Sequence, residues 1–400
     1  MPSSETQTVT AEMADAYSAW LAGFRQRALG ADVAVKTFDG ALAGVQPDLG
    51  VVHLAKNQAE HTRTTEDYVS RAVSEERLSN GRKKLEELSS LLGNLEARYG
   101  VPRTVLVAIW GLESRYGADP GTRSVLRSLA SLAAFDARRA RFWEKQLLAA
   151  LRIVEAGDIA ADAMTGSWAG AMGHTQFIPT TFEAYAVDHD GDGKRDIWSN
   201  EADALASAAD YLKRSGWARG LPWGWEVTLP AGFDYAGSGL ARRQPMEAWK
   251  AAGVRLAGGR NLPDAAGEIS LIVPQGAPGP AFLVTRNFRA VLRYNNAVPY
   301  ALAVSHLADR LGGGGPLAGD WPDVVPLTRA QRLDLQRRLV ALGYDTGGID
   351  GILGTKSVQA IRSEQRARGL PEDGFADAAL FKRLQTERID MTNRSGDNTQ

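Results

Sequence analysis

The chain of 400 residues contains no cysteine. This absence excludes disulfide bonds, thiolate chemistry and zinc sites built on cysteine, although it leaves the cellular compartment open. The sequence also lacks an apolar run long enough to span a bilayer. Its 46 basic and 47 acidic residues nearly cancel, whereas nucleic-acid-binding proteins usually carry a basic excess. We therefore expect neither a transmembrane segment nor nucleic acid as a partner. The first residues, Met1 to Thr8, are polar and show no signal-peptide pattern.

The composition is that of a globular protein, with 44% apolar and 23% charged residues, and the length predicts two or three domains. Helical periodicity dominates from residue 10 onward, but a Gly- and Pro-rich stretch with short β-prone runs interrupts it between about 221 and 288. Residues 312–326 have the composition of a linker, and residues 327–386 read as a separate unit. The sequence thus predicts a mainly α (α+β) fold: a helical body over 10–315 with a small β-containing insert, then a C-terminal three-helix module.

The most informative segment is the apolar run from Val101 to Gly117, which predicts a short helix ending in one carboxylate. Pro102 suits the first helical position, and Gly117 suits the residue after the last turn. Glu113 then falls on the apolar face, together with Val105, Leu106, Ile109 and Trp110. Burial raises the pKa of a carboxyl group, so Glu113 could serve as a general acid. The alternative is a rim residue or an ion-pair partner at the end of a packed helix.

Two further stretches carry polar groups in suggestive places. Residues 166–179 combine three glycines with Ser167 and Gln176, a pattern that permits close backbone approach to a ligand. The alternative there is a tight packing loop between helices. Further on, Tyr294 and Asn295 precede an apolar helix that includes Tyr300, and Asn295 could simply cap that helix.

An acidic loop follows the glycine-rich stretch and has the D-x-D-x-D-G spacing of an EF-hand-type calcium loop. The spacing assigns five ligand positions: Asp188, Asp190, Asp192, the backbone carbonyl of Lys194, and Asp196. Position 12 is Ser199 instead of the usual Glu, so Glu201 or Asp203 would have to reach in from a longer loop. This departure favours weak or structural calcium binding, and the alternative is an Asp/Gly turn without metal.

Together, these motifs resemble the membrane-bound lytic transglycosylase B family of cell-wall enzymes. Glu113-Ser-Arg-Tyr-Gly, GAMGHTQFIPTTFEAYAVDHDGDG and RYNNAVPYALAV occur in the family's order between about Tyr99 and Leu311. The resemblance implies a lysozyme-like catalytic body that cleaves the bond between N-acetylmuramic acid and N-acetylglucosamine and leaves a 1,6-anhydro end. It also implies that one Glu acts as both general acid and general base, with no cofactor needed for the chemistry. We find no obvious second carboxylate in the matching motifs, whereas an ordinary glycosidase pairs two.

The resemblance further implies roles for individual residues. Ser167 and Asn295 would contact or orient the substrate's N-acetyl group and Glu113. Residues that would line the cleft are Gln176, Tyr211, Tyr294 and Tyr300. Arg138 and Arg139 match a basic pair that could hold a carboxylate of the peptide stem, although such a pair is also typical of a solvated helix face. His174 stands where the family often carries an aromatic residue.

The C-terminal module resembles a three-helix peptidoglycan-binding domain. The resemblance rests on Leu335–Tyr344, on the Gly348–Gln365 segment with its Asp350-Gly351 pair, and on Leu370–Gly374; Ser357 stands where that family more often has Thr. Such a domain would raise the local concentration of glycan near the catalytic cleft, although a helical module for another partner is the alternative. The expected partners are peptidoglycan glycan strands and peptide stems, and the expected location is the periplasm. Two other readings remain: a muramidase that hydrolyses the same bond, and a non-catalytic wall-binding scaffold.

Overall fold

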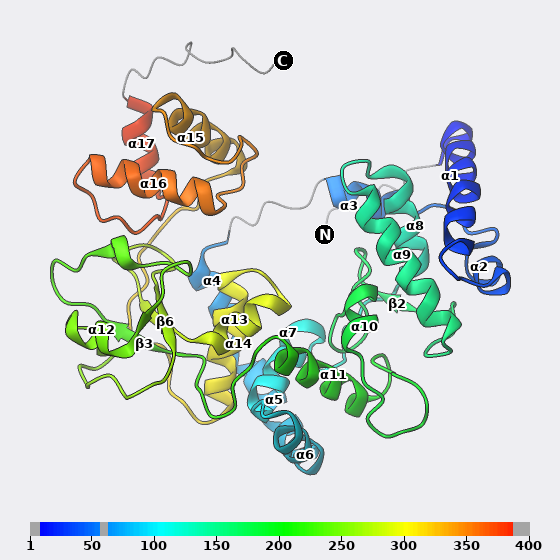
Figure 1. Ribbon diagram of the computed structural model, residues 1–400, viewed down its shortest axis with the longest axis horizontal. Helices are drawn as coiled ribbons and strands as arrows, with labels where there is room; N and C mark the ends of the chain where they lie inside the picture. Colours follow the sequence, from blue (N-terminus) through cyan, green and yellow to red (C-terminus); the bar gives the residue numbers. More distant parts are fainter. Residues whose placement is uncertain (1–8, 57–62, 387–400) are drawn as a thin grey trace. The chain divides into compact units, whose positions relative to one another are not determined.

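The computed structural model describes residues 9–56 and 63–386 (Figure 1). The chain divides into two compact units, Met1–Ala59 with Glu75–Ser215, and Glu60–Ser74 with Gly216–Gln400. The insertion of 60–74 into the second unit means that the chain leaves the first unit and returns to it. Within the described ranges, no helix combines the length and apolar character that a membrane span requires.

The first unit is mainly helical. Its helices are α1 (Ala11–Leu29), α2 (Val35–Leu42), α3 (Leu49–Lys56), α5 (Glu75–Glu87), α6 (Ser89–Tyr99), α7 (Arg103–Ser114), α8 (Val125–Phe135), α9 (Ala140–Glu155), α10 (Pro179–Tyr185) and α11 (Glu201–Arg214). Two short strands, β1 (Arg123–Ser124) and β2 (Thr165–Gly166), pair in antiparallel fashion. This pair brings the segment after α7 alongside the start of the glycine-rich stretch.

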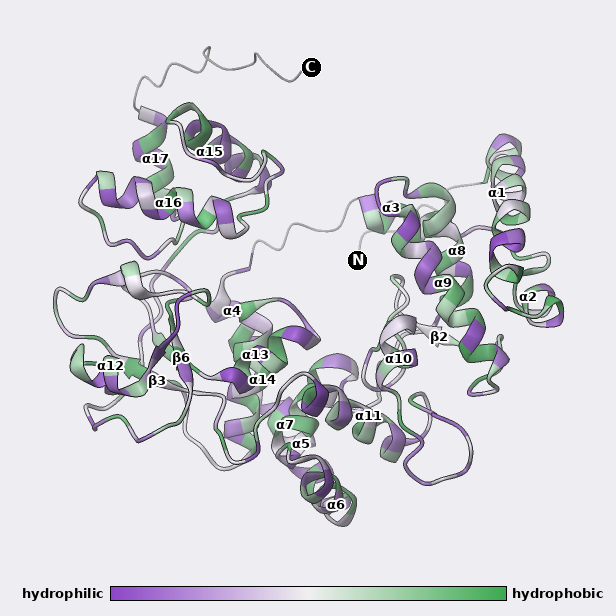
Figure 2. Ribbon diagram, viewed as in Figure 1, coloured by the Kyte–Doolittle hydropathy of each residue, from purple (hydrophilic) through white to green (hydrophobic). Residues whose placement is uncertain are grey.

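The core of this unit includes the packed pair α8 and α9. Hydrophobic and hydrophilic residues alternate along α9 (Figure 2), as expected for a helix that buries one face. Trp143, Leu147 and Leu151 on that face are buried. Because apolar burial contributes about 25 cal/mol per Å², such faces supply much of the stability of the unit.

The second unit contains the predicted insert, a linker and the C-terminal module. Its elements before the module are α4 (Thr65–Ala72), β3 (Gly224–Thr228), the 3₁₀ turn η1 (Tyr235–Gly237), β4 (Gln244–Pro245), α12 (Met246–Ala251), β5 (Arg255–Leu256), β6 (Glu268–Ile272), β7 (Ala281–Val284), α13 (Arg286–Tyr294) and α14 (Val298–Leu311). The strands form an antiparallel sheet in the order β4-β6-β7-β3-β5. The β-prone runs of the sequence correspond to β3, β6 and β7, and the mainly helical body with a small sheet is confirmed.

The sheet covers its own hydrophobic core. Trp225 lies opposite Leu283 in the β3–β7 register, and Leu271 and Leu283 are both fully buried. Trp249 on α12 is also buried, and its indole Nε1 donates to the carbonyl of Ile269 (3.2 Å). The insert is therefore a packed subdomain and not an extended loop.

The C-terminal module consists of α15 (Arg329–Ala341), α16 (Thr355–Ala367) and α17 (Ala378–Thr386) around a common core. The buried side chain of Gln336 organises its loops: Oε1 accepts from the backbone N of Gly351 (2.7 Å), and Nε2 donates to Ser357 Oγ (3.1 Å). Ser357 in turn donates to the carbonyl of Thr346 (2.9 Å). A serine at this position thus satisfies its buried hydroxyl without the methyl group of threonine.

The module and its linker contact the insert through hydrogen bonds. The Glu226 carboxylate on β3 accepts from the backbone N of Ala318 (2.8 Å) and of Gly319 (2.6 Å). On the module, Arg362 donates to the carbonyl of Tyr235 (3.0 Å) and to Ser238 Oγ (3.0 Å). These contacts attach the linker and α16 to the same subdomain.

The pH dependence of stability is expected to reflect His306, which lies on α14 and is 7% exposed. Burial, together with the charge of Arg310, lowers the pKa of His306 to about 4. Because the unfolded chain binds this proton near pH 6.5 and the native state only near pH 4, the contribution to stability is complete above pH 6.5 and is lost progressively as the pH falls from 6.5 through 4. We expect His306→Met to reduce the loss of unfolding free energy between pH 7.5 and 4.5 by about 2 kcal/mol in urea titrations. The exposed His53→Met should leave that loss unchanged, and a similar reduction in both variants would contradict the assignment.

Candidate active site

Glu113 lies in the last turn of α7, a helix that is buried on almost every side. Val105, Leu106, Ile109 and Trp110 are buried, as the apolar periodicity predicts, and Glu113 itself is half-buried. Pro102 is the N-cap residue and not the first helical residue, and the helix ends at Ser114 with Arg115 as the C-cap. The carboxyl group therefore sits at the end of a rigid, packed element.

The backbone after Glu113 is in an unusual conformation. Arg115, Tyr116 and Gly117 have φ values of 52°, 61° and 84°, so three successive residues occupy the left-handed region. A non-glycine residue there costs on the order of 1–3 kcal/mol and persists only where the surroundings fix it. Here the Tyr116 hydroxyl donates to the carbonyl of Arg77 (2.7 Å), and its ring packs edge-on against Trp110. The hydrogen bond to Arg77 and the ring contact with Trp110 thus hold the turn in this conformation.

The glycine-rich loop packs directly on this turn. Ser114 Oγ donates to the carbonyl of His174 (2.7 Å), and Gln176 Nε2 donates to the carbonyl of Pro120 (2.9 Å). Gln176 also has a positive φ of 51°. At Gly173, with φ 66°, an added Cβ would lie 2.3 Å from the carbonyl oxygen of Ile197. The structure therefore brings the segment bearing Glu113 and the loop bearing Gln176 together, as a shared site requires.

Other predicted residues of the first unit flank these two segments. Ser167 is half-buried, and its Oγ accepts from the backbone N of Ala171 (3.0 Å). The Tyr211 ring on α11 contacts the rings of Phe177 (centroids 5.8 Å apart) and Tyr185 (4.6 Å). This aromatic group lies beside the loop that follows Gln176.

The predicted basic pair lies at the turn between α8 and α9, where both side chains are exposed. The Arg139 guanidinium lies over the rings of Phe142 (4.4 Å) and Trp143 (4.6 Å). Such stacking fixes the guanidinium plane while leaving N–H groups available. Arg138 is exposed in the same turn, so the solvated-face alternative remains for it.

Three predicted residues belong to the second unit. Tyr294 ends α13, and Asn295 is exposed. The N-cap of α14 is Ala297 without a side-chain hydrogen bond, so Asn295 does not cap that helix. Tyr300 is 3% exposed and lies in the packed part of α14.

The acidic loop gathers a set of carboxylates that differs from the linear spacing. Ligand oxygens of Asp188, Asp190 and Asp203 all lie within 4.8 Å of one another. Asp203, on the first turn of α11, is fully buried and accepts from the backbone N of His189 (2.7 Å) and of Asp196 (2.8 Å). Burial raises the pKa of Asp203, and the charges of Asp190 and Asp188 add to that rise. A divalent cation would relieve this repulsion.

The remaining residues assigned by spacing have other partners. Asp192 Oδ1 accepts from the backbone N of Lys194 (2.8 Å), and Asp196 Oδ1 accepts from the backbone N of Trp198 (2.8 Å) and of Ser199 (2.9 Å). Glu201 pairs with Lys84 (3.1 Å). Of the two residues that could reach in from a longer loop, Asp203 therefore joins the carboxylate cluster. The signal for this in the sequence is its place at the expected start of a helix, seven residues after Asp196.

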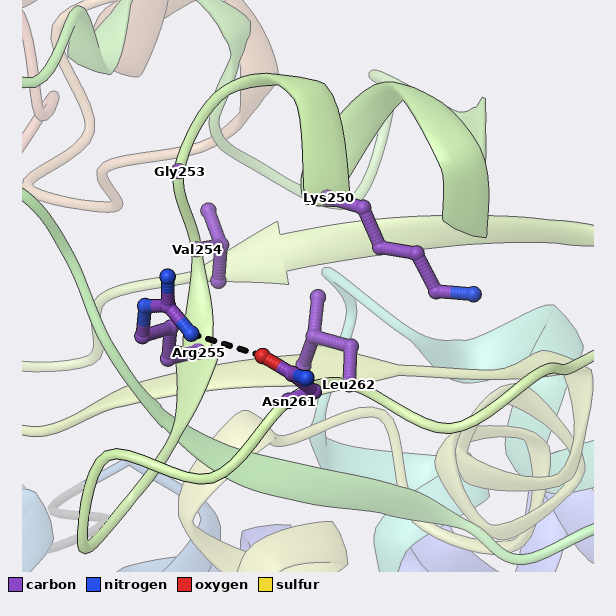
Figure 3. A pocket seen from close by; sticks show the side chains of 6 residues that line it. All are labelled: Lys250, Gly253, Val254, Arg255, Asn261 and Leu262. Carbon is purple, nitrogen blue, oxygen red and sulfur yellow. Dashed lines mark hydrogen bonds between the residues drawn. The ribbon is translucent and has the colours of Figure 1, made fainter.

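A separate pocket lies in the insert (Figure 3), with Val254 and Leu262 as buried members of its lining. Arg255 on β5 donates from Nη1 to Asn261 Oδ1 (2.6 Å), and the Lys250 ammonium points away from this pair toward Glu247 and Asp264. None of the residues singled out in the sequence lines this pocket, so it is distinct from the candidate active site.

Comparison with known proteins gives two family matches. Residues 16–309 match the model of the transglycosylase SLT domain, and residues 328–384 match a peptidoglycan binding domain. Over 252 residues the chain is 29% identical to membrane-bound lytic murein transglycosylase B of Escherichia coli (strain K12), an alignment that covers 60% of this chain and 65% of that protein. The aligned part is thus just under two thirds of that relative.

Two solved structures are informative. SltB3 from Pseudomonas aeruginosa, in complex with NAG-anhNAM-pentapeptide, superposes with a TM-score of 0.90 at 51% identity and covers 92% of this chain and 99% of its own. The Escherichia coli lytic transglycosylase SLT35, in complex with calcium, gives a TM-score of 0.63 at 26% identity, covering 73% of this chain and 92% of its own. All residues assigned to the candidate site, from Glu113 to Tyr300, fall within the matched range 16–309.

Proposed function

This chain belongs to the transglycosylase SLT family, and from that membership we propose that it is a lytic murein transglycosylase of the lysozyme-like type. The observation that carries the proposal is the half-buried Glu113 at the end of the packed helix α7, held against the glycine-rich loop. The solved relative SltB3 was crystallised with NAG-anhNAM-pentapeptide, which supports a peptidoglycan substrate with peptide stems. Wall glycan as the substrate supports a periplasmic location, which is part of this proposal.

The proposed reaction needs one titratable group. Protonated Glu113 donates its proton to the glycosidic oxygen as the bond from that oxygen to the anomeric carbon breaks. The carbonyl oxygen of the substrate's own acetamido group bonds to the anomeric carbon from the opposite side. Glu113, now a carboxylate, takes the proton from the sugar's 6-hydroxyl, whose oxygen displaces the acetamido oxygen and closes the 1,6-anhydro ring. The proton returns to Glu113, and no water is consumed.

Ser167 and Asn295 are proposed to orient the acetamido group, and Gln176, Tyr211, Tyr294 and Tyr300 to line the cleft. Arg138 and Arg139 would hold a carboxylate of the peptide stem. The exposure of both arginines and the stacking of Arg139 on two rings support that assignment. The C-terminal module would bind the same polymer and keep glycan near the catalytic unit.

The chemical form of the new sugar end tests the proposal. We expect digestion of purified peptidoglycan to yield muropeptides whose muramic acid is 18 Da lighter than the hydrolysed form, because the 6-hydroxyl takes the place of water. Mass spectrometry of the products distinguishes the two. Reducing ends that incorporate heavy oxygen from labelled water would identify a hydrolytic muramidase instead.

Calcium is proposed as a structural ion of the acidic loop. Asp188, Asp190 and Asp203 would supply its core carboxylate ligands, since these three lie together and calcium prefers oxygen ligands. Asp192, Lys194 and Asp196 remain further candidates from the loop spacing. A calcium complex of SLT35 supports the proposal. The ion would neutralise the carboxylates and stabilise the loop, and the reaction above does not use it.

The calcium proposal predicts a thermal shift. A ligand at one hundred times its Kd adds about 2.7 kcal/mol to the native state, so the unfolding midpoint should rise by several degrees between chelator and millimolar calcium. Asp190→Asn, which removes an exposed carboxylate of the cluster, should abolish that rise. Asp162→Asn, an exposed change outside the loop, should keep it. An unchanged midpoint in the unmodified protein would count against a bound ion.

A further inference from the structure

His174 lies between α7 and the end of the acidic loop and is 8% exposed. Its imidazole Nδ1 accepts a hydrogen bond from Trp110 Nε1 (3.0 Å), and the two rings stack with centroids 5.6 Å apart and planes 25° from parallel. The imidazole also forms a hydrogen bond with the backbone of Trp198. Because indole nitrogen only donates, this arrangement requires the tautomer with its lone pair on Nδ1.

The backbone of His174 is fixed as firmly as its ring. Its N–H donates to the carbonyl of Ile197 (2.8 Å), and its carbonyl accepts from Ser114 Oγ (2.7 Å). Ser114 Oγ also accepts from the backbone N of Gly117 (3.0 Å). At Gly117, an added Cβ would lie 2.5 Å from His174 Cε1, so the imidazole is in close contact with the left-handed turn.

These contacts bracket Glu113 along the chain. Trp110 lies three residues before it, one helical turn back on the same side of α7, and Ser114 follows it directly. Replacement of the imidazole would release Trp110 and remove the close contact with Gly117, so the strained turn after Ser114 would be free to relax, whereas the backbone carbonyl that accepts from Ser114 would remain. A misplacement of about 1 Å in a catalytic group can cost on the order of 10²-fold in rate.

We infer that His174 is a positioning residue whose imidazole fixes the Glu113 carboxyl group through its contacts with Trp110 and with the turn at Gly117. The inference rests on the role proposed for Glu113. His174 itself exchanges no proton with substrate. It acts through α7, so its loss should lower the rate of the chemical step and leave glycan binding nearly unchanged.

The test uses the full chain and a soluble glycan of alternating N-acetylglucosamine and N-acetylmuramic acid. His174→Phe keeps a flat ring but removes the acceptor, and Trp110→Phe removes the donor. We expect each to lower kcat by about 10- to 100-fold with KM within about threefold. His174→Asn places a carbonyl oxygen near the position of Nδ1 and should recover most of kcat. The double Phe variant should be no slower than the slower single variant, because one contact cannot be lost twice.

Trp249→Phe is the matched control, since it removes the hydrogen bond of another buried indole in the insert. It should lower the unfolding midpoint without lowering kcat. Three results would each overturn the inference. They are losses in kcat no larger than in this control, additive losses in the double variant, and no recovery of kcat in His174→Asn. If His174→Phe does not fold, Trp110→Phe and His174→Asn decide the matter.

Failure of this inference is separable from failure of the proposed function. If Glu113→Gln is inactive while His174→Phe and Trp110→Phe keep a normal kcat, the positioning role of His174 is wrong and the proposed function stands. Full activity of Glu113→Gln removes the role of Glu113 and, with it, the basis for positioning by His174.

Discussion

Replacing Glu113 by Gln should lower kcat on peptidoglycan by about 10²- to 10⁴-fold, the range typical of a lost general acid–base group. The amide is nearly isosteric but can neither donate a proton to the glycosidic oxygen nor accept one from the 6-hydroxyl. Binding should persist, because the packed residues of α7 and the C-terminal module are unchanged. The measurement is the rate of release of soluble muropeptides from purified sacculi, followed by chromatography.

The control for this change is Glu96→Gln, which removes a surface carboxylate that pairs with Arg103 (3.5 Å) elsewhere in the same unit. It should retain full turnover, and both variants should unfold near the midpoint of the unmodified protein. Turnover that survives in Glu113→Gln would show that another group supplies the proton. No turnover in the unmodified protein would favour a non-catalytic scaffold that retains the fold.

Replacing Gly173 by Ala should produce the second large effect, a loss of about 3 kcal/mol in unfolding free energy. Its φ of 66° penalises any side chain, and an added Cβ would lie 2.3 Å from the carbonyl oxygen of Ile197. That carbonyl cannot easily shift away from the added methyl group, because it accepts a hydrogen bond from the backbone N of His174 (2.8 Å). Activity should fall as well, since the same loop contacts the turn after Glu113. Chemical unfolding of the full chain measures the change.

Gly157→Ala separates the two causes. Gly157 has a φ of 81° but nothing within 4 Å of the position where its Cβ would lie. It should therefore cost only the left-handed strain of about 1 kcal/mol. The difference between the two alanine variants is the cost of the contact with Ile197. Equal losses in both variants would show that the loop yields to the added methyl group.

The elements of this fold were predictable wherever local pattern determines structure. The apolar face of α7 follows from the 3.6-residue period, and the β-prone runs of the insert correspond to β3, β6 and β7. The motif order around Glu113 also identified the family that the comparisons show. Each of these features depends on residues close together in the chain.

The features that were not predictable depend on contacts from distant segments. Arg115 and Tyr116 are not residues that favour the left-handed region, and they adopt it because Tyr116 is tied to Arg77 and Trp110. The sequence leaves Glu201 and Asp203 as alternatives, and Asp203 is the one that joins the carboxylate cluster, because it lies beside the acidic loop at the start of α11 whereas Glu201 pairs with Lys84 (3.1 Å). The sequence shows His174 only as a departure from the family's aromatic residue, because its contact with Trp110 spans 64 positions of sequence.

The hydrogen bonds from the backbone N of Ala318 and of Gly319 to the Glu226 carboxylate limit the distance that the linker allows between the insert and the C-terminal module. By composition, residues 312–326 would form a flexible linker, yet hydrogen bonds to Glu226 hold the linker to the insert near its middle. Extra residues inserted before Ala318 would loop out without extending the module's reach, whereas residues inserted after Pro322, whose carbonyl accepts from Gln275 Nε2 (3.3 Å), would lengthen the segment between the last linker contact and the module. The reach of the module thus depends on the contacts that hold the linker and α16 to the insert, made by Glu226, Gln275 and Arg362, and not on the number of glycines in the linker.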